Sequence, residues 1–460
     1  MLRDRIVKGL KSHAASAAPL FLVAGILLIG SIPILKPKRN FIDESAVNVG
    51  NIPVLVTPFD ASRYDTKVLQ DHRIVHGRRS VGAETIAVYV NTAEKSSIVL
   101  ANNLMDVLRR RESMACDVDF YFVNSSAPHW PIPSAFVRSA VAINISSLNT
   151  HKLCFGVYGK NGMQPNQDLF NVAAAIGIQR GFQIDLLCQN PYIKYFVERS
   201  RYQHYLAALQ TALVAPQSPL AWYNFRSHGI SLLSISTAET DGSREASNAY
   251  SLAALHEQII ATLSYLDERF HHSTSVWVPL SVNEYVEHDV AQFGIILLVA
   301  SLLSTGYSIY EVKGLSLSPC VALIFVAPVF ASSATEWLGI SGFLLSSSFM
   351  IIAWSVCEWD LSWLTVNAVV LCLLIILQPA AGLLIGSGTA IQLVFLHVKY
   401  QRPLVLLLGF LCSWAVLYCF VEVLNIKVCD TKTIGGIYLS FFGYPNALWV
   451  SSRLIRSLLY

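Results

Sequence analysis

Two histidines, His72 and His76, stand four residues apart in the stretch His-Arg-Ile-Val-His. On a helix this spacing places both imidazoles on one face, where they could hold zinc. A zinc protease of that kind also needs a glutamate directly after the first histidine as its general base, and Arg73 occupies that place. We therefore interpret the two histidines as a chance pair on a helix and predict no metal site.

Other patterns that support catalysis are missing from the sequence. It contains no Gly-x-Ser-x-Gly turn for a serine nucleophile, no Cys-x-x-Cys pair and no glycine-rich phosphate loop. His271 and His272 fit a role at a helix end better than one in catalysis. The residues alone therefore predict no catalytic group and no cofactor. The formal net charge of +3 is too small and too dispersed to indicate a nucleic-acid partner.

The apolar composition points to a membrane protein. Hydrophobic residues make up 53% of the 460 residues and charged residues only 14%, whereas soluble domains carry about 25% charge. The charged residues are concentrated in residues 36–289, which read as an ordinary globular domain. The stretch Ser362–Val398 has no charged residue at all and is too long for one crossing, which takes about 20 apolar residues. We expect two helices there, with a reversal at Leu377–Gly382.

Eight apolar runs are predicted to span the membrane, namely residues 14–35, 290–310, 315–334, 338–356, 362–377, 380–398, 403–424 and 434–454. The run 362–377 is short for a span. The resulting organisation is a cytosolic N-terminus (1–13), an anchor helix (14–35), a lumenal domain (36–289) and a seven-helix transmembrane domain (290–456). The distribution of Lys and Arg then places both termini in the cytosol.

The globular region alternates strand-like and helix-like patterns, which predicts an α/β domain with a mixed, largely parallel sheet and helices on both faces. Strands are expected at 53–57, 85–90, 118–123, 153–158 and 230–235, and helices at 97–111, 166–180, 192–213 and 245–270. Cys116, Cys154 and Cys188 lie in this region. An oxidising lumen would allow one disulfide and one free thiol, and three buried thiols are the alternative.

Polar residues in the apolar part and two glycosylation sequons are further candidates. Gln378, Glu422 and Asn446 lie in or beside predicted spans, where polar groups serve either interhelical hydrogen bonds or a ligand path. The residues leave both readings open. The sequons at Asn124 and Asn144 fit a lumenal domain.

Several motifs together resemble a known family. Phe41–Val47 is similar to a Tyr-x-Ser-Glu-Asn-Ala-x motif, with Phe41, Asp43 and Ser45 as departures. Gly159–Leu169 is similar to a Gly-x-Asn-Gly-x-x-Pro-Asn-x-Asp-Leu loop and is the most specific match. These motifs, together with Tyr265–Ser273 and Gly443–Pro445, resemble the GPI-anchor attachment protein family, a subunit of the endoplasmic-reticulum GPI transamidase.

The resemblance implies a domain with the fold of a zinc aminopeptidase but without its metal. Where that enzyme type has a His-x-Asp pair, this chain has Val90–Glu94, and no strand end offers a Glu-Glu pair. The resemblance also implies that the catalytic cysteine belongs to another, cysteine-protease-like subunit. This chain would be a non-catalytic, multi-pass subunit of the endoplasmic-reticulum membrane that organises the complex for attachment of GPI to protein C-termini.

The family further implies that this subunit binds the GPI glycolipid among its C-terminal helices. The residues expected to contact the lipid are Gln378, Pro379, Gly386, Glu422 and Asn446. Two other interpretations remain open at this point. One is a membrane-anchored zinc metallopeptidase. The other is a polytopic transporter, which would show paired halves with broken helices, and no such repeat is present.

Overall fold

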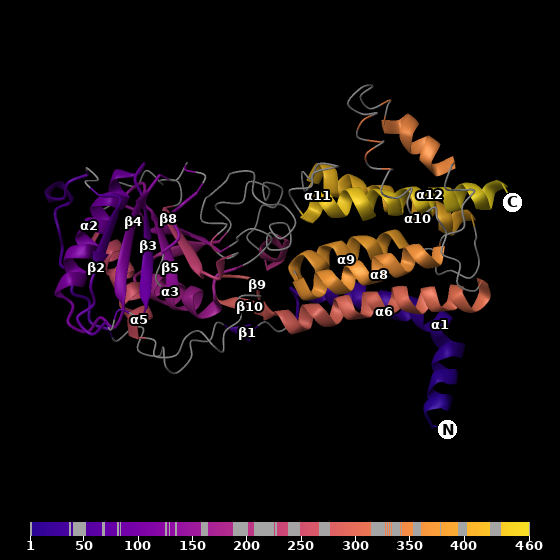
Figure 1. Ribbon diagram of the computed structural model, residues 1–460, viewed down its shortest axis with the longest axis horizontal. Helices are drawn as coiled ribbons and strands as arrows, with labels where there is room; N and C mark the ends of the chain where they lie inside the picture. Colours follow the sequence, from indigo (N-terminus) through magenta and orange to yellow (C-terminus); the bar gives the residue numbers. More distant parts are fainter. Residues whose placement is uncertain are drawn as a thin grey trace. The chain divides into compact units, whose positions relative to one another are not determined.

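The structure is a computed structural model of the chain (Figure 1). It describes residues 2–35, 38–39, 52–66, 70–80, 82, 84–124, 127, 129–133, 136–157, 164–186, 201–206, 225, 228–237, 249–265, 277–313, 327, 329, 331, 333, 341, 343–352, 360–377, 379–393, 403–423 and 434–459. The chain folds as two compact units. The α/β unit comprises Lys36–Ala208 and Pro216–Val286, and the helical unit comprises Met1–Leu35, Leu209–Ala215 and Glu287–Tyr460.

A seven-stranded sheet forms the centre of the α/β unit, with strand order β2-β4-β3-β5-β8-β6-β7. The strands are β2 (His72–Val75), β3 (Thr85–Asn91), β4 (Asp117–Val123), β5 (Val137–Asn144), β6 (Lys152–Gly156), β7 (Gln183–Asp185) and β8 (Leu232–Thr237). Parallel pairing joins β4, β3, β5 and β8, and also β6 and β7, whereas β2 and β6 run antiparallel to β4 and β8. The predicted mixed, largely parallel sheet is therefore confirmed.

Four of the five predicted strands are present as β3, β4, β6 and β8. The prediction of a strand at 53–57 was wrong. That segment is extended but pairs with no strand, because a buried side chain takes up the N–H groups of Leu55 and Val56. The sequence analysis also missed β5 in the middle of the sheet. Its first half contains Arg138, which forms an ion pair with Glu84, and Ser139, so it does not read as a buried strand.

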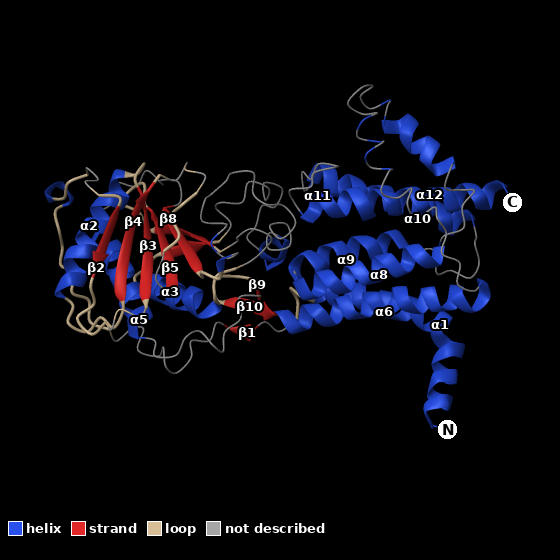
Figure 2. Ribbon diagram, in the orientation of Figure 1, coloured by secondary structure: helices blue, strands red, loops and turns tan. Residues whose placement is uncertain are grey.

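The three long helices of this unit share one face of the sheet. They are α2 (Lys95–Arg110), α3 (Gln167–Gln179) and α5 (Ala249–Tyr265). Each matches a predicted helix, and the fourth prediction, 192–213, lies mostly outside the described residues. We expected helices on both faces. Within the described ranges, these long helices all lie on the face that carries Phe122 and Phe155, because Arg73 bridges Phe122 to α2 and Phe155 packs against α3 (Figure 2).

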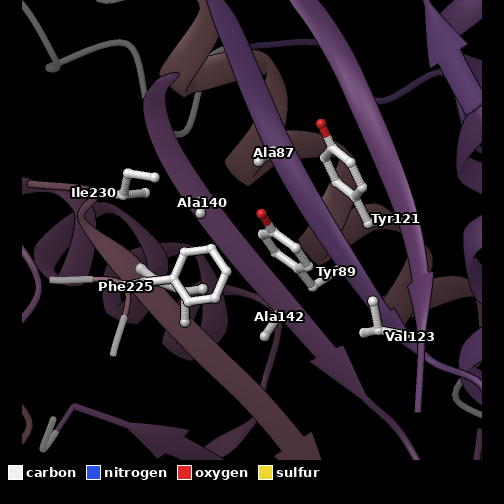
Figure 3. Packing of buried hydrophobic residues seen from close by; sticks show 9 residues of the cluster. Ala87, Tyr89, Tyr121, Val123, Ala140, Ala142, Phe225 and Ile230 are labelled. Atoms are coloured by element: carbon white, nitrogen blue, oxygen red, sulfur yellow. The ribbon is translucent and has the colours of Figure 1, made fainter. Parts of the chain in front are cut away.

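Aromatic rings cover the opposite face of the sheet (Figure 3). The buried cluster there consists of Ala87, Tyr89, Tyr121, Val123, Ala140, Ala142, Phe225, Ile230 and Leu232, with Trp130 and Val137 packed against it. Tyr89 lies at its centre and is fully buried. Its ring stacks between those of Tyr121 and Trp130, at centroid distances of 5.1 and 5.2 Å. Burial raises the pKa of Tyr89 well above its usual range. The Tyr89 hydroxyl is therefore neutral and donates to Pro131 O at 2.8 Å.

One buried carboxylate ties the helical layer together. Glu257 on α5 is fully buried and accepts hydrogen bonds from Leu55 N, from Val56 N at 2.9 Å, and from the guanidinium of Arg111. Arg111 is the C-terminal cap of α2 and also donates to Pro53 O. The pair thus joins α2, α5 and the segment 53–56. The neighbouring His256 is buried as well, and burial lowers its pKa to about 4, so it is neutral at pH 7.

We expect Glu257→Gln to destabilise the α/β unit strongly, because it leaves the buried charge of Arg111 without its partner. Breaking a buried ion pair typically costs about 3–5 kcal/mol of unfolding free energy. Thermal unfolding of the full chain would measure the effect. The matched control is Glu112→Gln, since Glu112 forms an exposed ion pair with Arg78, and such pairs are worth about 0–1 kcal/mol. Equal shifts in the two variants would contradict the prediction.

Short elements complete the α/β unit. A three-stranded sheet of order β1-β10-β9 is built from β1 (Lys38–Arg39), β10 (Glu284–Glu287) and β9 (Trp277–Pro279). Because β1 pairs antiparallel with β10, residues near the two ends of the globular region lie side by side. A short 3₁₀ turn, η2 (Ala61–Arg63), begins at Asp60, whose carboxylate accepts from Ser62 N at 3.0 Å.

Helices make up the described part of the second unit. They are α1 (Leu2–Ser31), α6 (His288–Lys313), α8 (Asp360–Leu377), α9 (Pro379–Leu393), α10 (Pro403–Tyr418), α11 (Ile434–Tyr438) and α12 (Tyr444–Leu459), with π-helical turns η8 (Cys419–Val423) and η9 (Leu439–Gly443). Helix α8 ends at Leu377 and α9 begins at Pro379, within the reversal that the sequence predicted at Leu377–Gly382. Among the residues that the structure describes, no helix combines the length and apolar character that a membrane crossing requires.

Helices α1 and α6 approach closely through two glycines (Figure 1). A Cβ atom built on Gly294 would lie 2.6 Å from Ile29 Cγ1. One built on Gly25 would lie 2.8 Å from Leu298 Cδ2 and 3.1 Å from Gly294 O. Real Cβ atoms do not come this close to other heavy atoms, so the crossing requires glycine on both helices. Helices far apart in the sequence are thereby packed against each other.

Gly294→Leu should force α1 and α6 apart and destabilise the helical unit, because overpacking a close contact typically costs about 1–3 kcal/mol. To measure this destabilisation, the detergent-solubilised chain would be heated, and the temperature at which it loses its single size-exclusion peak would be recorded. Gly30→Leu provides the control on the same helix, since a Cβ atom at Gly30 meets no atom within 4 Å. If both variants tolerated the same temperature, the glycine crossing would not be what holds the two helices.

Candidate functional site at the carboxyl edge of the sheet

The carboxyl ends of four parallel strands meet at one edge of the large sheet. Because β3, β4, β5 and β8 run in the same direction, their last residues lie together. In open α/β sheets this edge is where ligands usually bind. Asn91 ends β3, Asn144 ends β5 and Thr237 ends β8. We call these three residues, together with Ser146, the carboxyl edge.

Amide and hydroxyl groups of the carboxyl edge bind one another. Asn91 Nδ2 donates to Asn144 Oδ1 at 2.7 Å, and Asn91 Oδ1 accepts from Ala93 N at 3.1 Å. The hydroxyls of Ser146 and Thr237 lie 2.6 Å apart, and Thr237 Oγ1 also accepts from Ser146 N at 3.0 Å. These bonds fix the ends of three strands relative to one another. The edge is therefore a rigid surface of neutral polar groups.

The first turn of α2 packs against the same edge. Ser97 Oγ accepts from Ile145 N at 2.7 Å, and Ser96 Oγ donates to Ser146 O at 3.1 Å. Glu94 is the N-terminal cap residue of α2, and its side chain makes no capping hydrogen bond. The helix thus starts directly beside Asn144 and Ser146, and its first hydroxyls support the loop that follows β5.

The residues of the carboxyl edge are not suited to bind a zinc ion. Asn91, Thr92 and Ala93 stand at and just after the end of β3, where the resemblance implied that a zinc aminopeptidase would carry His-x-Asp. Neutral amides and hydroxyls are poor zinc ligands, whereas imidazole, thiolate and carboxylate are good ones. In the described ranges, no group of three or more His, Cys, Asp or Glu side chains is placed to hold a metal.

His72 begins an edge strand and His76 directly follows that strand, so the two histidines do not share a helix. This corrects the interpretation of the His-Arg-Ile-Val-His stretch. β2 covers His72–Val75 and pairs antiparallel with β4, and His76 follows directly after it. His72 Nε2 lies 3.8 Å from Asp119, and His76 Nδ1 lies 3.3 Å from Asp117. Burial raises the pKa of Asp119, and the charge of His72 partly offsets this. The pairs are cross-strand contacts.

Trp130 lies beside the carboxyl edge and was not singled out by the sequence analysis. Its ring stacks on Tyr89, and its Nε1 donates to Asn124 O at 3.3 Å. Tyr89 precedes Asn91 by two residues on β3, so the two side chains share a face and are separated by about 7 Å along the strand. Trp130 is half-buried, so part of its ring faces solvent. Only the fold shows that this tryptophan belongs to the edge.

The cysteines of the α/β unit divide into two kinds. Cys116 is free and buried, and burial raises the pKa of its thiol. Cys154 is disulfide-bonded, and its partner lies outside the described residues. This arrangement corresponds to the first of the two alternatives left open by the sequence, in which one disulfide coexists with a free thiol. Disulfides persist in oxidising compartments.

The five residues expected to contact lipid lie in different surroundings. Gln378 is outside the described residues, and Pro379 is the first residue of α9. Gly386 is buried, and a Cβ atom there would lie 3.4 Å from Leu298 of α6 and 3.7 Å from Leu371 of α8. Glu422 is exposed on the π-helical turn η8. Asn446 is fully buried on α12.

Asn446 belongs to a buried hydrogen-bond network between helices. Its Oδ1 accepts from Trp363 Nε1 at 2.7 Å, and its Nδ2 donates to Asn367 Oδ1 at 3.2 Å. Gln392 Nε2 donates to Gly443 O at 2.9 Å, in the π-helical turn η9. Ser347 and Thr389 each bond a tyrosine hydroxyl, at 2.7 and 2.8 Å. These contacts are interhelical, and they join α8 and α9 to the last helices.

A comparison with known families finds that residues 130–310 match the family described as "Gaa1-like, GPI transamidase component". This match confirms the family that the motifs predicted. The Gaa1-like segment begins at Trp130 and extends into α6, and it contains β5, β8 and α5. Asn144, Ser146 and Thr237 all lie within it. A search of curated proteins gives no match. The Gaa1-like match supports a role as a component of the GPI transamidase, and such a component has other subunits as partners.

The two sequons differ in the structure, and we expect only Asn124 to carry a glycan. Asn124 is exposed just after β4, whereas Asn144 is half-buried and its side chain is held by Asn91. Asn124→Gln should therefore remove the glycosidase-sensitive shift in electrophoretic mobility, and Asn144→Gln should leave it unchanged. A shift that disappears only in Asn144→Gln would contradict this assignment.

Proposed function

We propose that this chain is a non-catalytic subunit of the GPI transamidase that binds the GPI lipid and presents it to a separate catalytic subunit. The observation that carries the proposal is the Gaa1-like match over residues 130–310. The neutral side chains of the carboxyl edge support the non-catalytic role, because Asn91, Asn144 and Thr237 provide neither a metal ligand set nor a general base.

We further propose that the chain is a multi-pass protein of the endoplasmic-reticulum membrane, with residues 36–289 in the lumen and both termini in the cytosol. The support comes from the eight apolar runs of the sequence and from the placement of Lys and Arg between them. The disulfide at Cys154 agrees with a lumenal α/β unit. The boundaries at residues 14, 36 and 290 and the short run 362–377 are part of this proposal.

The lipid is proposed to lie against the helices that follow residue 290, with its polar part at the lumenal rim. Gln378 and Glu422 are the rim groups of this proposal, since an amide and a carboxylate can bind a phosphate, a hydroxyl or an amine. Pro379 fixes the start of α9 beside Gln378. Gly386 and Asn446 support the wall from inside, because both are buried among neighbouring helices.

Gln378→Leu should lower GPI attachment several-fold while the complex still assembles, because a lost hydrogen bond to the ligand costs about 0.5–1.5 kcal/mol. The variant would be expressed in cells that lack the subunit, and free GPI and unprocessed precursor protein would be quantified. Co-purification of the other subunits measures assembly.

The matched control is Gln378→Asn, which keeps the amide and should restore most of the attachment. Normal attachment in Gln378→Leu would contradict the lipid placement. Loss of co-purification in Gln378→Leu would indicate that Gln378 holds subunits or helices together instead.

A further inference from the structure

The carboxyl edge has hydrogen-bonding capacity that its own contacts leave unused. Asn144 Oδ1 accepts from Asn91, but within the described residues no acceptor lies within bonding distance of Asn144 Nδ2. The paired hydroxyls of Ser146 and Thr237 share one hydrogen atom, so the second can be donated outward. Asn144 is half-buried and Ser146 is exposed, so a ligand can reach both. The edge therefore offers donors and acceptors held in fixed positions.

The chemistry of these groups selects a neutral ligand. The side chains that bind one another at the edge are amides and hydroxyls, and none of them carries a charge. A surface of this kind gives an ionic ligand no counter-charge, whereas it can both donate to and accept from hydroxyl groups. A polyhydroxylated molecule matches it best, because each of its hydroxyls is also a donor and an acceptor.

Trp130 adds an apolar surface of the size of a sugar ring. One side of its ring is packed on Tyr89, which holds the indole in place, and its Nε1 is already bonded to Asn124 O. Sugars present C–H groups on one face and hydroxyls at the rim, and aromatic rings in protein sites take up the C–H face. Trp130 and Asn144 are on the same face of the sheet. Trp130 stacks on Tyr89, and Tyr89 pairs with Ala142 of β5. Two residues further along each strand, on the same face, Asn91 bonds to Asn144.

We propose that the carboxyl edge of the sheet binds a neutral sugar, with Asn144 Nδ2 and the Ser146–Thr237 hydroxyl pair as its hydrogen-bonding groups and Trp130 as its stacking surface. In a catalytic α/β enzyme the same edge would hold the reacting groups. Here it is a binding surface, and the neutral side chains of Asn144, Ser146 and Thr237 are what suit it to a glycan.

A peptide is the alternative occupant, and the edge fits it less well. An extended peptide binds chiefly by adding a strand, which requires a free row of backbone N–H and C=O groups along a sheet edge. The carboxyl edge is instead formed by the ends of strands that are paired on both sides, such as β3 and β5. Its unused groups belong to side chains and are clustered around Asn144 and Ser146.

This inference rests on the proposed function only for the source of the sugar, which would be the glycan of the GPI lipid. Binding of a free sugar can be measured without any GPI attachment. The two proposals can therefore fail separately, since Gln378→Leu tests the lipid placement and leaves the carboxyl edge untouched.

The test uses the full chain in a detergent without a sugar headgroup, and a neutral mannose trisaccharide as the probe. Saturation-transfer NMR detects sugar protons that contact the protein, and a titration gives the dissociation constant. We expect transfer to the sugar at millimolar concentration. Asn144→Asp keeps the acceptor for Asn91 but removes both N–H groups, and it should weaken binding about three- to tenfold. Thr237→Val should act in the same direction, and Trp130→Ala should reduce transfer to the C–H face.

Asn283→Asp provides the control, because Asn283 is exposed in the turn between β9 and β10, which belong to the small sheet and not to the sheet that forms the carboxyl edge. It should bind the sugar like the unchanged chain. The proposal is overturned by the absence of transfer at millimolar sugar, by equal weakening in Asn144→Asp and Asn283→Asp, or by binding of a blocked tetra-alanine peptide in place of the sugar. A glycan found on Asn144 itself would also overturn it, because that glycan would cover the edge.

Discussion

The buried carboxylate of Glu257 is the contact on which the helical layer of the α/β unit depends. A charge inside a protein is tolerated only when it is paired and fully hydrogen-bonded. Arg111 supplies the pair, and Leu55 and Val56 supply backbone donors. Because these partners come from α2 and from a segment some 200 positions away in the sequence, the ion pair fixes where both lie against α5. The sheet can then present the ends of its strands in a single arrangement.

The same arrangement places neutral polar side chains at the carboxyl edge of the sheet. The parallel strands still bring their carboxyl ends together, as the topology requires. The residues at those ends are Asn91, Asn144 and Thr237, whose hydrogen bonds with Ser146 and Ala93 are all between neutral groups. Asn91, Asn144, Ser146 and Thr237 include no acid, base or charged metal ligand. The edge that the parallel strands create therefore carries neutral hydrogen-bonding groups.

The helical unit uses two different means of holding its helices together. At the crossing of α1 and α6, Gly25 and Gly294 allow the backbones to approach within the range where any side chain would clash. Near the last helices, Asn446 instead bridges Trp363 and Asn367 by hydrogen bonds. Asn446 is thus a structural link between helices. Gln392 of α9 adds a third link, because its Nε2 donates to Gly443 O in the π-helical turn η9.

The sequence by itself determined the α/β class of the globular unit, four strands and three long helices of that unit, the reversal between α8 and α9, and the family. These depend on local periodicity, on turn residues and on short motifs, which are readable in one dimension. Only the tertiary structure decided that β5 is central, that 53–57 is not a strand and that His72 begins an edge strand. It also decided that Trp130 stacks on Tyr89, on the sheet face that carries Asn144. The physical reason is that hydrogen-bond partners such as Glu257 for Leu55, and stacking partners such as Tyr89 for Trp130, are distant in sequence and become neighbours only when the sheet has formed.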